Sequence, residues 1–313
     1  MSLGVLELND NHFIGTLSFV QAQPYYPLRV LYLRNSFYSG KIPRWLQSAD
    51  LLWSLDMSNN FFEAQIPCFL SGYYLIDLSL NQLSGSLASC PDLFTRVEHL
   101  FTFGLSSPMT LDIRDNRFSG KIPNEIGRLS DLKVLLLSGN NFSGIIPKQL
   151  CLLNYIVLMD LSRNSFSGTI PYCLHNMAFG KIDNFYGSYY SLDTDLTFVL
   201  FRTTGSYKCL LNCDFEIYQP KEINTHIGIE FVMKYRSYFY KGGILDIMHG
   251  LDLSSNKLTG QIPPELGQLS QILVLNLSYN QLTCFIPKSF SNLTQLESLD
   301  LSHNNLVGKF LQP

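Results

Sequence analysis

Apolar residues recur along this chain in a fixed pattern: two leucine-type positions flank a variable residue, then two further positions lead to an asparagine. Residues 111–123 read LDIRDNRFSGKIP, residues 135–147 read LLLSGNNFSGIIP and residues 251–263 read LDLSSNKLTGQIP. The asparagine position recurs ten times, at Asn11, Ser36 (in place of asparagine), Asn60, Asn81, Asn116, Asn140, Asn164, Asn256, Asn280 and Asn304. Seven steps are 21 to 25 residues long, most of them 24. A repeat of this length predicts a stack of similar coils.

Each repeat predicts one short strand with its side chains facing alternately inward and outward. In residues 135–137 we expect Leu135 and Leu137 to point into the core and Leu136 to point out. Phe142 and Ile146 are expected to fill the interior behind the strand, because one coil cannot bury its apolar face alone. An asparagine side chain has two donors and an acceptor, so it can satisfy backbone groups in the buried turn. We therefore interpret the asparagine column as structural.

The S-G-x-I-P ending of the repeats is similar to that of the plant-specific class of leucine-rich repeats. Glycine recurs there, at Gly120, Gly144, Gly168 and Gly260, and fits a backbone turn unfavourable for side chains. Proline follows at Pro123, Pro147, Pro171 and Pro263 and suits a sheet edge. The resemblance implies a right-handed superhelical horseshoe with a parallel β-sheet on its concave face. Such a solenoid consists mostly of strands and loops, with short 3-10 turns.

One long interruption separates the last three repeats from the others. The step from Asn164 to Asn256 is 92 residues, one coil of 24 plus 68 extra. Residues 180–247 lack the repeat, but they hold eight tyrosines and six phenylalanines, and disordered segments are poor in such residues. Alternation in residues 227–231 and an apolar run over residues 196–201 predict strands there. We therefore expect an island domain that folds onto the solenoid.

The position of this island, and the residues PYCLHNM at 171–177 before it, resemble the plant receptor-like proteins and the brassinosteroid-receptor-like kinases. The family consists of cell-surface receptors that signal through partner kinases, which places the parent protein at the plasma membrane, on its extracellular side. The resemblance implies that solenoid and island together recognise an extracellular peptide or protein, in immunity or development. It also implies co-receptor and adaptor receptor kinases with leucine-rich repeats as partners.

The expected organisation is an N-terminal array over residues 1–179, an island over 180–247 and a truncated C-terminal array over 248–313. The step from Asn81 to Asn116 is 35 residues, which predicts one degenerate coil around residues 97–107. That coil should be the weakest point of the N-terminal array. Both ends run as repeat without a terminal cap, which indicates an internal portion of a longer parent or the product of a degraded gene.

The composition limits the classes of function. The chain has 313 residues, 46% apolar and 15% charged, with a net charge of -3. These values indicate an ordered protein and give no electrostatic signature for binding nucleic acid. The sequence contains no run of 18 apolar residues, so it predicts no membrane span. The N-terminus lacks the basic and hydrophobic pattern of a signal peptide. We expect no cofactor.

The sequence has seven cysteines, whose spacing indicates whether the protein resides in an oxidising compartment. Cys68 and Cys90 are 22 residues apart, as are Cys151 and Cys173, so near-equivalent positions of successive coils come within disulfide reach. Cys209 and Cys213 could close a small loop, which leaves Cys284 alone, and such pairing would suit an oxidising compartment. The alternative is that these cysteines are buried small apolar residues. The spacing offers no metal site, since Cys209 and Cys213 lack a second pair of ligands. Acceptor sequons for glycosylation start at Asn141, Asn276 and Asn292.

Motifs for enzyme chemistry are missing from the sequence: it has no HExxH, no phosphate loop, no GxSxG and no histidine cluster. Aspartate recurs at Asp56, Asp77, Asp112, Asp160, Asp252 and Asp300. These residues occupy the same outward strand position in different coils, so we interpret them as solvated members of the repeat rather than as catalytic carboxylates. We expect that the protein is not an enzyme.

Residues that depart from the repeat on the expected concave face are the binding candidates. Aromatic and arginine side chains are enriched at binding hot spots. The ligand-binding candidates are Arg29, Tyr32, Arg34, Trp53, Arg114, Asp115, Asp160, Arg163 and Asp252, and the co-receptor candidates are Tyr279 and His303. The region near Asp160, Arg163 and Asp252 is the expected contact point, because it lies beside the island. Two alternatives remain: a secreted inhibitor of a microbial cell-wall-degrading enzyme, similar to polygalacturonase inhibitors, and a non-functional truncated gene product.

Overall fold

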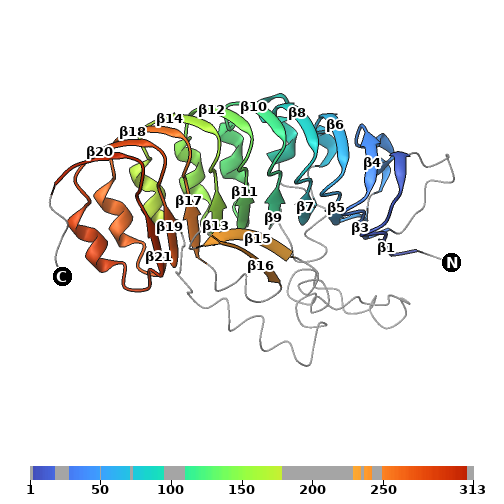
Figure 1. Ribbon diagram of the computed structural model, residues 1–313. Helices are drawn as coiled ribbons and strands as arrows, with labels where there is room; N and C mark the ends of the chain where they lie inside the picture. The colour runs from blue at the N-terminus through green and yellow to red at the C-terminus, as the bar shows by residue number, and fades with distance from the viewer. Residues whose placement is uncertain are drawn as a thin grey trace, which may run out of the picture.

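The structure, a computed structural model, describes residues 3–17, 28–49, 51–70, 73–94, 110–177, 228–233, 236–241 and 249–308 (Figure 1). Ten parallel strands, one from each coil, form a single sheet along the solenoid. In sheet order they are β1 (Val5–Glu7), β3 (Val30–Tyr32), β5 (Ser54–Asp56), β7 (Leu75–Asp77), β9 (Thr110–Asp112), β11 (Val134–Leu136), β13 (Leu158–Asp160), β17 (Gly250–Asp252), β19 (Val274–Asn276) and β21 (Ser298–Asp300). This sheet, called the concave sheet below, confirms the predicted leucine-rich repeat solenoid.

A second ten-stranded parallel sheet follows the first, as the S-G-x-I-P ending predicts. Its strands are β2 (Ile14–Thr16), β4 (Phe37–Gly40), β6 (Phe61–Gln65), β8 (Gln82–Ser86), β10 (Arg117–Gly120), β12 (Asn141–Ile145), β14 (Ser165–Gly168), β18 (Lys257–Gln261), β20 (Gln281–Cys284) and β22 (Asn305–Leu306). The glycine in this strand has a positive φ, for example +82° at Gly144, which L side chains rarely adopt. The repeated glycine is therefore a backbone requirement of the second strand.

Short 3-10 helices complete the coils. They are η1 (Arg44–Ser48), η2 (Cys68–Leu70), η3 (Leu87–Ser89), η4 (Pro91–Phe94), η6 (Asn124–Arg128), η7 (Lys148–Leu152), η8 (Tyr172–Asn176), η10 (Pro264–Gln268) and η11 (Lys288–Asn292). Each long one follows the proline of I-P, whose fixed φ suits the entry to a helix. The predicted 3-10 turns are thus confirmed within the described residues.

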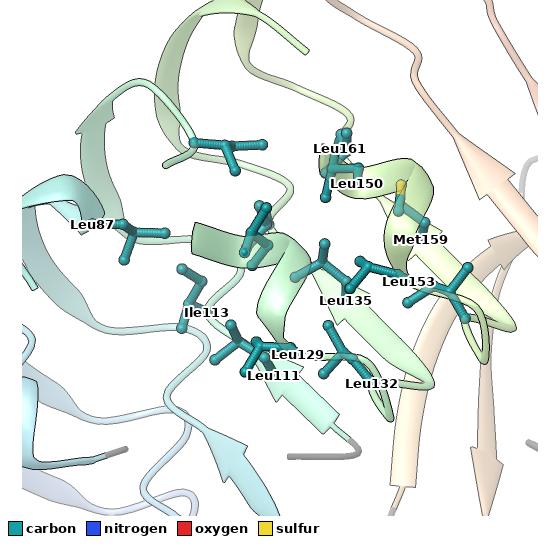
Figure 2. Close-up of a cluster of buried hydrophobic side chains, with 14 of the residues drawn as sticks. Leu87, Leu111, Ile113, Leu129, Leu132, Leu135, Leu150, Leu153, Met159 and Leu161 are labelled. Carbon is teal, nitrogen blue, oxygen red and sulfur yellow. The ribbon is translucent and has the colours of Figure 1, made fainter. Parts of the chain in front are cut away.

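Leucine-type positions of successive coils, such as Leu111, Leu135 and Met159, pack into one continuous core (Figure 2). The phenylalanines behind the second strands belong to the same core. Leu135 and Leu137 are fully buried, as their inward alternation predicts. The rings of Phe118, Phe142 and Phe166 stack through the interior, with centroids 6.2 Å apart at each step. The apolar core therefore runs unbroken from coil to coil, which no single coil could achieve.

The buried asparagine of each coil joins that coil to the preceding one. Asn140 Nδ2 donates to the carbonyl oxygens of Leu137 at 3.1 Å and Ser138 at 3.3 Å in its own turn. It also donates to Ile113 O of the preceding coil at 2.9 Å, and its Oδ1 accepts from Phe118 N at 3.0 Å. The asparagine column is therefore structural, because it satisfies buried backbone groups that would otherwise lack partners.

The solenoid continues directly across the long insertion. Strand β13 pairs in parallel with β17, so that Asp160 and Asp252 are opposite each other in register. Asn256 Nδ2 donates to Leu161 O at 3.0 Å, although 95 residues separate the two. The two coils are therefore neighbours in the stack, and the insertion adds no strand to the concave sheet.

Part of the insertion forms an antiparallel hairpin of β15 (Gly228–Met233) and β16 (Arg236–Lys241), in the region where alternation predicts a strand. In the view of Figure 1 this hairpin crosses below β9, β11 and β13. Most of the expected island, including the apolar run at 196–201 and the pair Cys209 and Cys213, lies outside the described residues. The island as a domain thus remains a prediction.

The second irregular step differs from the sequence prediction. The 35-residue spacing suggests a degenerate coil around residues 97–107, but β7 pairs directly with β9. Asn116 Nδ2 donates to Leu78 O at 2.9 Å, so the asparagine network also passes from one coil to the next. No extra coil stands between them in the concave sheet. Residues 97–107 themselves lie outside the described residues.

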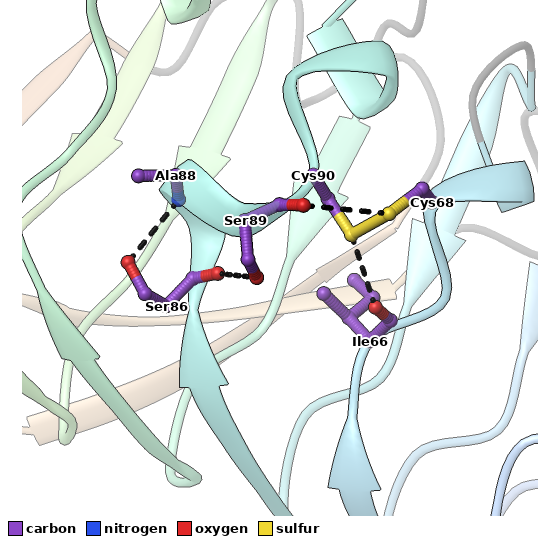
Figure 3. The surroundings of a disulfide bond; sticks show 6 residues. All are labelled: Ile66, Cys68, Ser86, Ala88, Ser89 and Cys90. Carbon is purple, nitrogen blue, oxygen red and sulfur yellow. Dashed lines mark hydrogen bonds between the residues drawn. A yellow bond between two sulfur atoms is a disulfide. The ribbon is translucent and has the colours of Figure 1, made fainter.

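Two disulfides join successive coils, at the pairs that the 22-residue spacing indicates. Cys68 bonds Cys90, with Cα atoms 4.9 Å apart (Figure 3), and Cys151 bonds Cys173, with Cα atoms 5.8 Å apart. All four cysteines lie in or next to the 3-10 helices, away from the concave sheet. Cys284 is exposed and is the free cysteine among the described residues.

Candidate functional site

The outward-facing side chains of the concave sheet are buried in the middle of the solenoid and exposed towards its ends. Leu136 faces outward from β11 and is 0% exposed. It packs in a second apolar cluster with Leu75, Val134, Leu158 and Val274, separate from the main core. Towards the ends, Glu7 of β1 is exposed and Asp300 of β21 is half-buried. A ligand would therefore reach only part of the concave sheet.

The recurring aspartates terminate the concave strands through local hydrogen bonds. Asp56 Oδ1 accepts from Ser58 N at 2.9 Å and from Ser58 Oγ at 2.6 Å, and Asp77 accepts in the same way from Ser79. Asp112 instead holds Arg114, whose Nε donates to Asp112 Oδ1 at 2.9 Å. Our interpretation of these carboxylates as solvated is wrong for Asp112, because it is buried, and the same holds for Asp160 and Asp252.

Burial and mutual repulsion raise the pKa values of several of these carboxyl groups. Asp56, Asp77 and Asp112 are in register on adjacent strands. Desolvation, followed by the charges of Asp112 and Asp56, raises the pKa of Asp77 well above its usual value. Desolvation and the charge of Asp160 raise the pKa of Asp252 to about 7. Because these groups bond to the backbone of their own turn, they serve the fold.

A second column lies one residue before the asparagine position of each coil. Its members are Asp10, Asn35, Asn59, Leu80, Asp115, Gly139, Arg163, Ser255, Tyr279 and His303, and we call it the rim column. Every one has a positive φ, between +49° and +67°. This backbone turn directs the residue away from the core, so the rim column can vary without disturbing the packing.

An ion pair bridges two coils in the middle of the rim column. Arg163 Nη2 lies 3.0 Å from Asp115 Oδ1, across the intervening coil that carries Gly139. A Cβ atom on Gly139 would collide with the Asp115 carboxylate, so glycine leaves the space that this pair uses. The Arg163 side chain is nevertheless 56% exposed. The rim column therefore presents a positioned guanidinium to solvent beside a carboxylate.

The last two coils carry an aromatic pair on the rim column. The rings of Tyr279 and His303 are stacked with centroids 4.0 Å apart, and Tyr279 is 54% exposed. Both residues were predicted from their departure from the repeat. Their stacking comes from the coil-to-coil spacing and the shared backbone turn, which place equivalent side chains directly above one another.

The remaining candidates divide by accessibility. Arg34 is exposed, Arg29 and Arg114 are half-buried, and the other concave candidates are buried: Tyr32, Trp53, Asp160 and Asp252. Tyr32 Oη lies 3.0 Å from Ser54 Oγ, and Trp53 packs edge-on against Tyr74. These buried side chains contact their neighbours along the sheet. Of the expected contact point, only Arg163 is open to a ligand.

The three predicted glycosylation sites also differ in how accessible their side chains are. Asn141 and Asn292 are exposed. Asn276 is half-buried, its Nδ2 donates to Asp252 Oδ2 at 3.0 Å, and its Oδ1 accepts from Ser278 Oγ at 2.8 Å. The Asn276 side chain therefore plays the part that aspartate plays in other coils, and a glycan there would break these bonds.

Sequence reasoning overlooked an exposed aromatic column on the N-terminal coils. His12, Phe37 and Phe61 come directly after the asparagine position, and Phe37 and Phe61 are 45% and 46% exposed. Aligning the residue after each asparagine would have revealed this cluster. Within the described residues, no group of histidine, cysteine and carboxylate side chains could hold a metal ion, and no helix could cross a membrane.

Comparisons with known proteins agree with this architecture. Profiles described as leucine rich repeat match residues 248–306 and residues 107–129, 131–153 and 155–177. Receptor-like protein 1 of Arabidopsis thaliana is 39% identical over 103 residues, 32% of this chain and 9% of that protein. Cuscuta receptor 1 of Solanum lycopersicum is 51% identical over 53 residues, 17% of this chain and 5% of that protein. The matched regions are thus small parts of these relatives.

A solved structure with the same fold is that of the Arabidopsis receptor kinase HAESA in complex with the peptide hormone IDA and the co-receptor SERK1. It aligns with a TM-score of 0.67 and 28% identity, over 98% of this chain and 39% of that one. The stacked coils described above are therefore similar to those of this receptor kinase.

Proposed function

We propose that this chain, which belongs to the leucine-rich repeat receptor-like proteins of plants, is a portion of the ligand-binding ectodomain of a cell-surface receptor. Its ligand would be an extracellular peptide or protein, and signalling in immunity or development would pass through partner receptor kinases. Two inter-coil disulfides support an oxidising environment such as the extracellular side of the plasma membrane. HAESA, with a related fold, forms a complex with a peptide and a co-receptor.

One observation carries the proposal: the exposed pair of Arg163 and Asp115 in the middle of the solenoid. The buried carboxylates of the concave sheet are occupied with backbone bonds, whereas the Arg163 guanidinium reaches solvent. An arginine has five N–H donors in a rigid fork, so donors remain free for a carboxylate or carbonyl of a ligand. Arg163 lies in the last coil before the chain leaves the solenoid, so the expected island would border the site.

Tyr279 and His303 are the proposed contact for the co-receptor. Aromatic side chains with exposed rings are common anchors at protein interfaces. The stacking of these two rings fixes their position before a partner arrives, which reduces the entropy lost on binding. One coil, that of Ser255, lies between the Arg163 coil and the Tyr279 coil, so the two proposed contacts use different coils.

The test is selection of short peptides by the whole chain from a displayed library. Peptides selected by the wild-type chain should bind at least about tenfold more weakly to an Arg163→Ala variant. Arg128→Ala is the matched control, because Arg128 is also exposed but lies on η6, away from the rim column. The stability of both variants should stay within about 0.5 kcal/mol of wild type. Equal binding by Arg163→Ala and wild type would refute the assignment of the site.

A further inference from the structure

A groove with a volume of about 470 Å³ follows the rim of the first coils, where the two sheets meet. Residues of the rim column form one side of it, and the column that follows the asparagines forms the other. Asp115, the partner of Arg163 in the proposed ligand contact, lies at its far end, whereas Arg163, Tyr279 and His303 do not line it. The inference below rests on the side chains of the first three coils, which take no part in the proposed function.

Amide side chains form a hydrogen-bonded ladder along the first side of the groove. Asn59 Nδ2 donates to Asn35 Oδ1 at 2.7 Å, and Asn35 Nδ2 donates to Asp10 Oδ1 at 2.8 Å. An amide nitrogen has two hydrogens, so each asparagine retains one donor for a ligand. Because all three residues are exposed and hold one another in place, the groove offers a row of fixed polar groups.

Aromatic rings form a matching ladder along the second side. His12 and Phe37 have centroids 5.9 Å apart, and Phe37 and Phe61 lie 6.1 Å apart with an interplanar angle of 13°. Nearly half of each phenylalanine is exposed, although burying an aromatic ring is strongly favourable in water. The exposed rings therefore offer apolar contact area that the fold leaves unused.

Both ladders span the same three coils and end at the fourth. Leu80 takes the place of the amide on the rim column, and Gln82 takes the place of the ring. Gln82 is held from the next coil by Arg117, whose Nη2 donates to Gln82 Oε1 at 3.2 Å. Core packing does not require this agreement, because neither column enters the core. A common ligand explains why the two columns change together.

The groove lining contains no lysine or arginine among the described residues, and it holds two carboxylates, Asp10 at one end and Asp115 at the other. An anionic ligand would thus find no lysine or arginine side chain to pair with in the groove. A ligand that fits must present apolar faces to the rings and many hydroxyl groups to the amides, at intervals that repeat like the coils. Sugar rings have this amphipathic character, since their C–H faces can stack on aromatic rings while their hydroxyls bond to amides.

We propose that this groove binds a neutral, extended oligosaccharide. Phe37 and Phe61 stack on successive sugar rings, and Asn35 and Asn59 donate to their hydroxyl groups. The ligand lies along the rim, across the coils, and leaves the concave sheet and Arg163 free. Binding is non-covalent and needs no metal ion or cofactor.

The experiment is isothermal titration of the full chain with soluble oligosaccharides of β-linked glucose, mannose and xylose. Oligogalacturonate serves as the anionic counterpart and a neutral hydrophilic peptide as the non-sugar counterpart. At least one neutral oligosaccharide should bind, and Phe37→Ala and Phe61→Ala should each weaken it about tenfold, equivalent to about 1.4 kcal/mol. Asn59→Gly, which keeps the positive φ, should weaken it as well. Phe285→Ala is the matched control, because Phe285 is exposed on a distant coil.

Three results would overturn the proposal. The first is that no neutral oligosaccharide binds to the wild-type chain. The second is that binding survives the loss of both rings, in variants whose thermal unfolding matches that of wild type. The third is that oligogalacturonate or the peptide binds in the groove more tightly than any neutral sugar, which would assign the site to another class of ligand.

Discussion

The asparagine position and the rim residue before it are neighbours in every coil, and in the coil of Asn60 the two side chains meet opposite environments. The Asn60 side chain is buried and makes four hydrogen bonds, two within its own turn and two to the previous coil. The Asn59 side chain is exposed and donates to another rim side chain, Asn35. The same amide group thus serves the fold at one position and a surface at the next. Two adjacent residues of one turn therefore differ in role: the first offers a side chain for recognition, and the second stabilises the fold.

This separation explains how the solenoid tolerates variation. The asparagine position is almost constant over the ten coils, whereas the rim column holds an acid, amides, an arginine and aromatic rings. The φ of the rim residue is nevertheless alike in every coil. Chemistry can therefore change coil by coil while the backbone repeats, which produces an amide and aromatic groove at one end and a charged pair in the middle.

The largest expected effect comes from the core, which should behave unlike the rim. Phe142→Ala removes a fully buried ring from the stack of Phe118, Phe142 and Phe166, and should lower the free energy of unfolding by about 3–5 kcal/mol. Phe61→Ala removes a half-exposed ring and should cost less than about 1 kcal/mol. Urea titrations of both variants measure the difference. Similar losses in the two variants would show that the rim ring also carries the fold.

A buried carboxylate of the concave sheet should give stability a pH dependence. Asp252 has a raised pKa of about 7 in the folded chain, against an ordinary value of 3.8, so the folded chain holds more protons between these values. Its contribution is therefore greatest below pH 3.8 and is lost as the pH rises towards about 7. The unfolding midpoint of wild type relative to Asp252→Asn should fall as the pH rises through this window.

Asp252→Asn is a conservative test, because Asn276 fills the equivalent position in the next coil and makes the same bonds to Ser278. Burial lowers the pKa of His249, which acts in the opposite direction, but His249 is unchanged in the variant. The difference between the two pH profiles therefore reports Asp252 together with its interaction with Asp160. Parallel profiles would show that this carboxyl group is ionised alike in the folded and unfolded chains.

A smaller effect should appear at the glycine position of the second sheet. Cys284 has a φ of +67° where other coils have glycine, for example Gly260 at +79°. Cys284→Gly should raise the free energy of unfolding by about 1 kcal/mol, because glycine adopts this backbone without strain. Cys284→Ser should give no such gain. Chemical denaturation of the three proteins compares them, and a loss of stability in the glycine variant would contradict the argument.

Much of this fold could be predicted because the sequence repeat shows which residues are equivalent in successive coils. The inward leucines, the asparagine column, the second strand and both disulfide pairs follow from equivalent positions in successive coils. The spacing from Asn81 to Asn116 misled, because a period in sequence does not distinguish a shortened coil from one coil with extra residues. Strand pairing resolves the difference, since only spatial neighbours exchange backbone hydrogen bonds.

The site was harder to predict than the fold. Departure from the repeat selected Tyr32, Trp53 and Asp160 as concave-face candidates, but it could not show that these side chains are buried. Arg163, Tyr279 and His303 are accessible because they belong to the rim column, and a positive φ cannot be read from alternation. Departure from the repeat was therefore a useful signal only at positions where the backbone exposes the side chain.

The central claim, that neighbouring positions divide stability from recognition, is tested most directly by paired substitutions at Asn60 and Asn59. Asn60→Ala removes three donated bonds and one accepted bond from a buried turn, and should lower the free energy of unfolding by about 3 kcal/mol. Asn59→Gly keeps the positive φ and removes one exposed side-chain bond, so it should change the free energy of unfolding by less than about 0.5 kcal/mol. Equal losses of stability, measured by urea denaturation of the two variants side by side, would contradict the account.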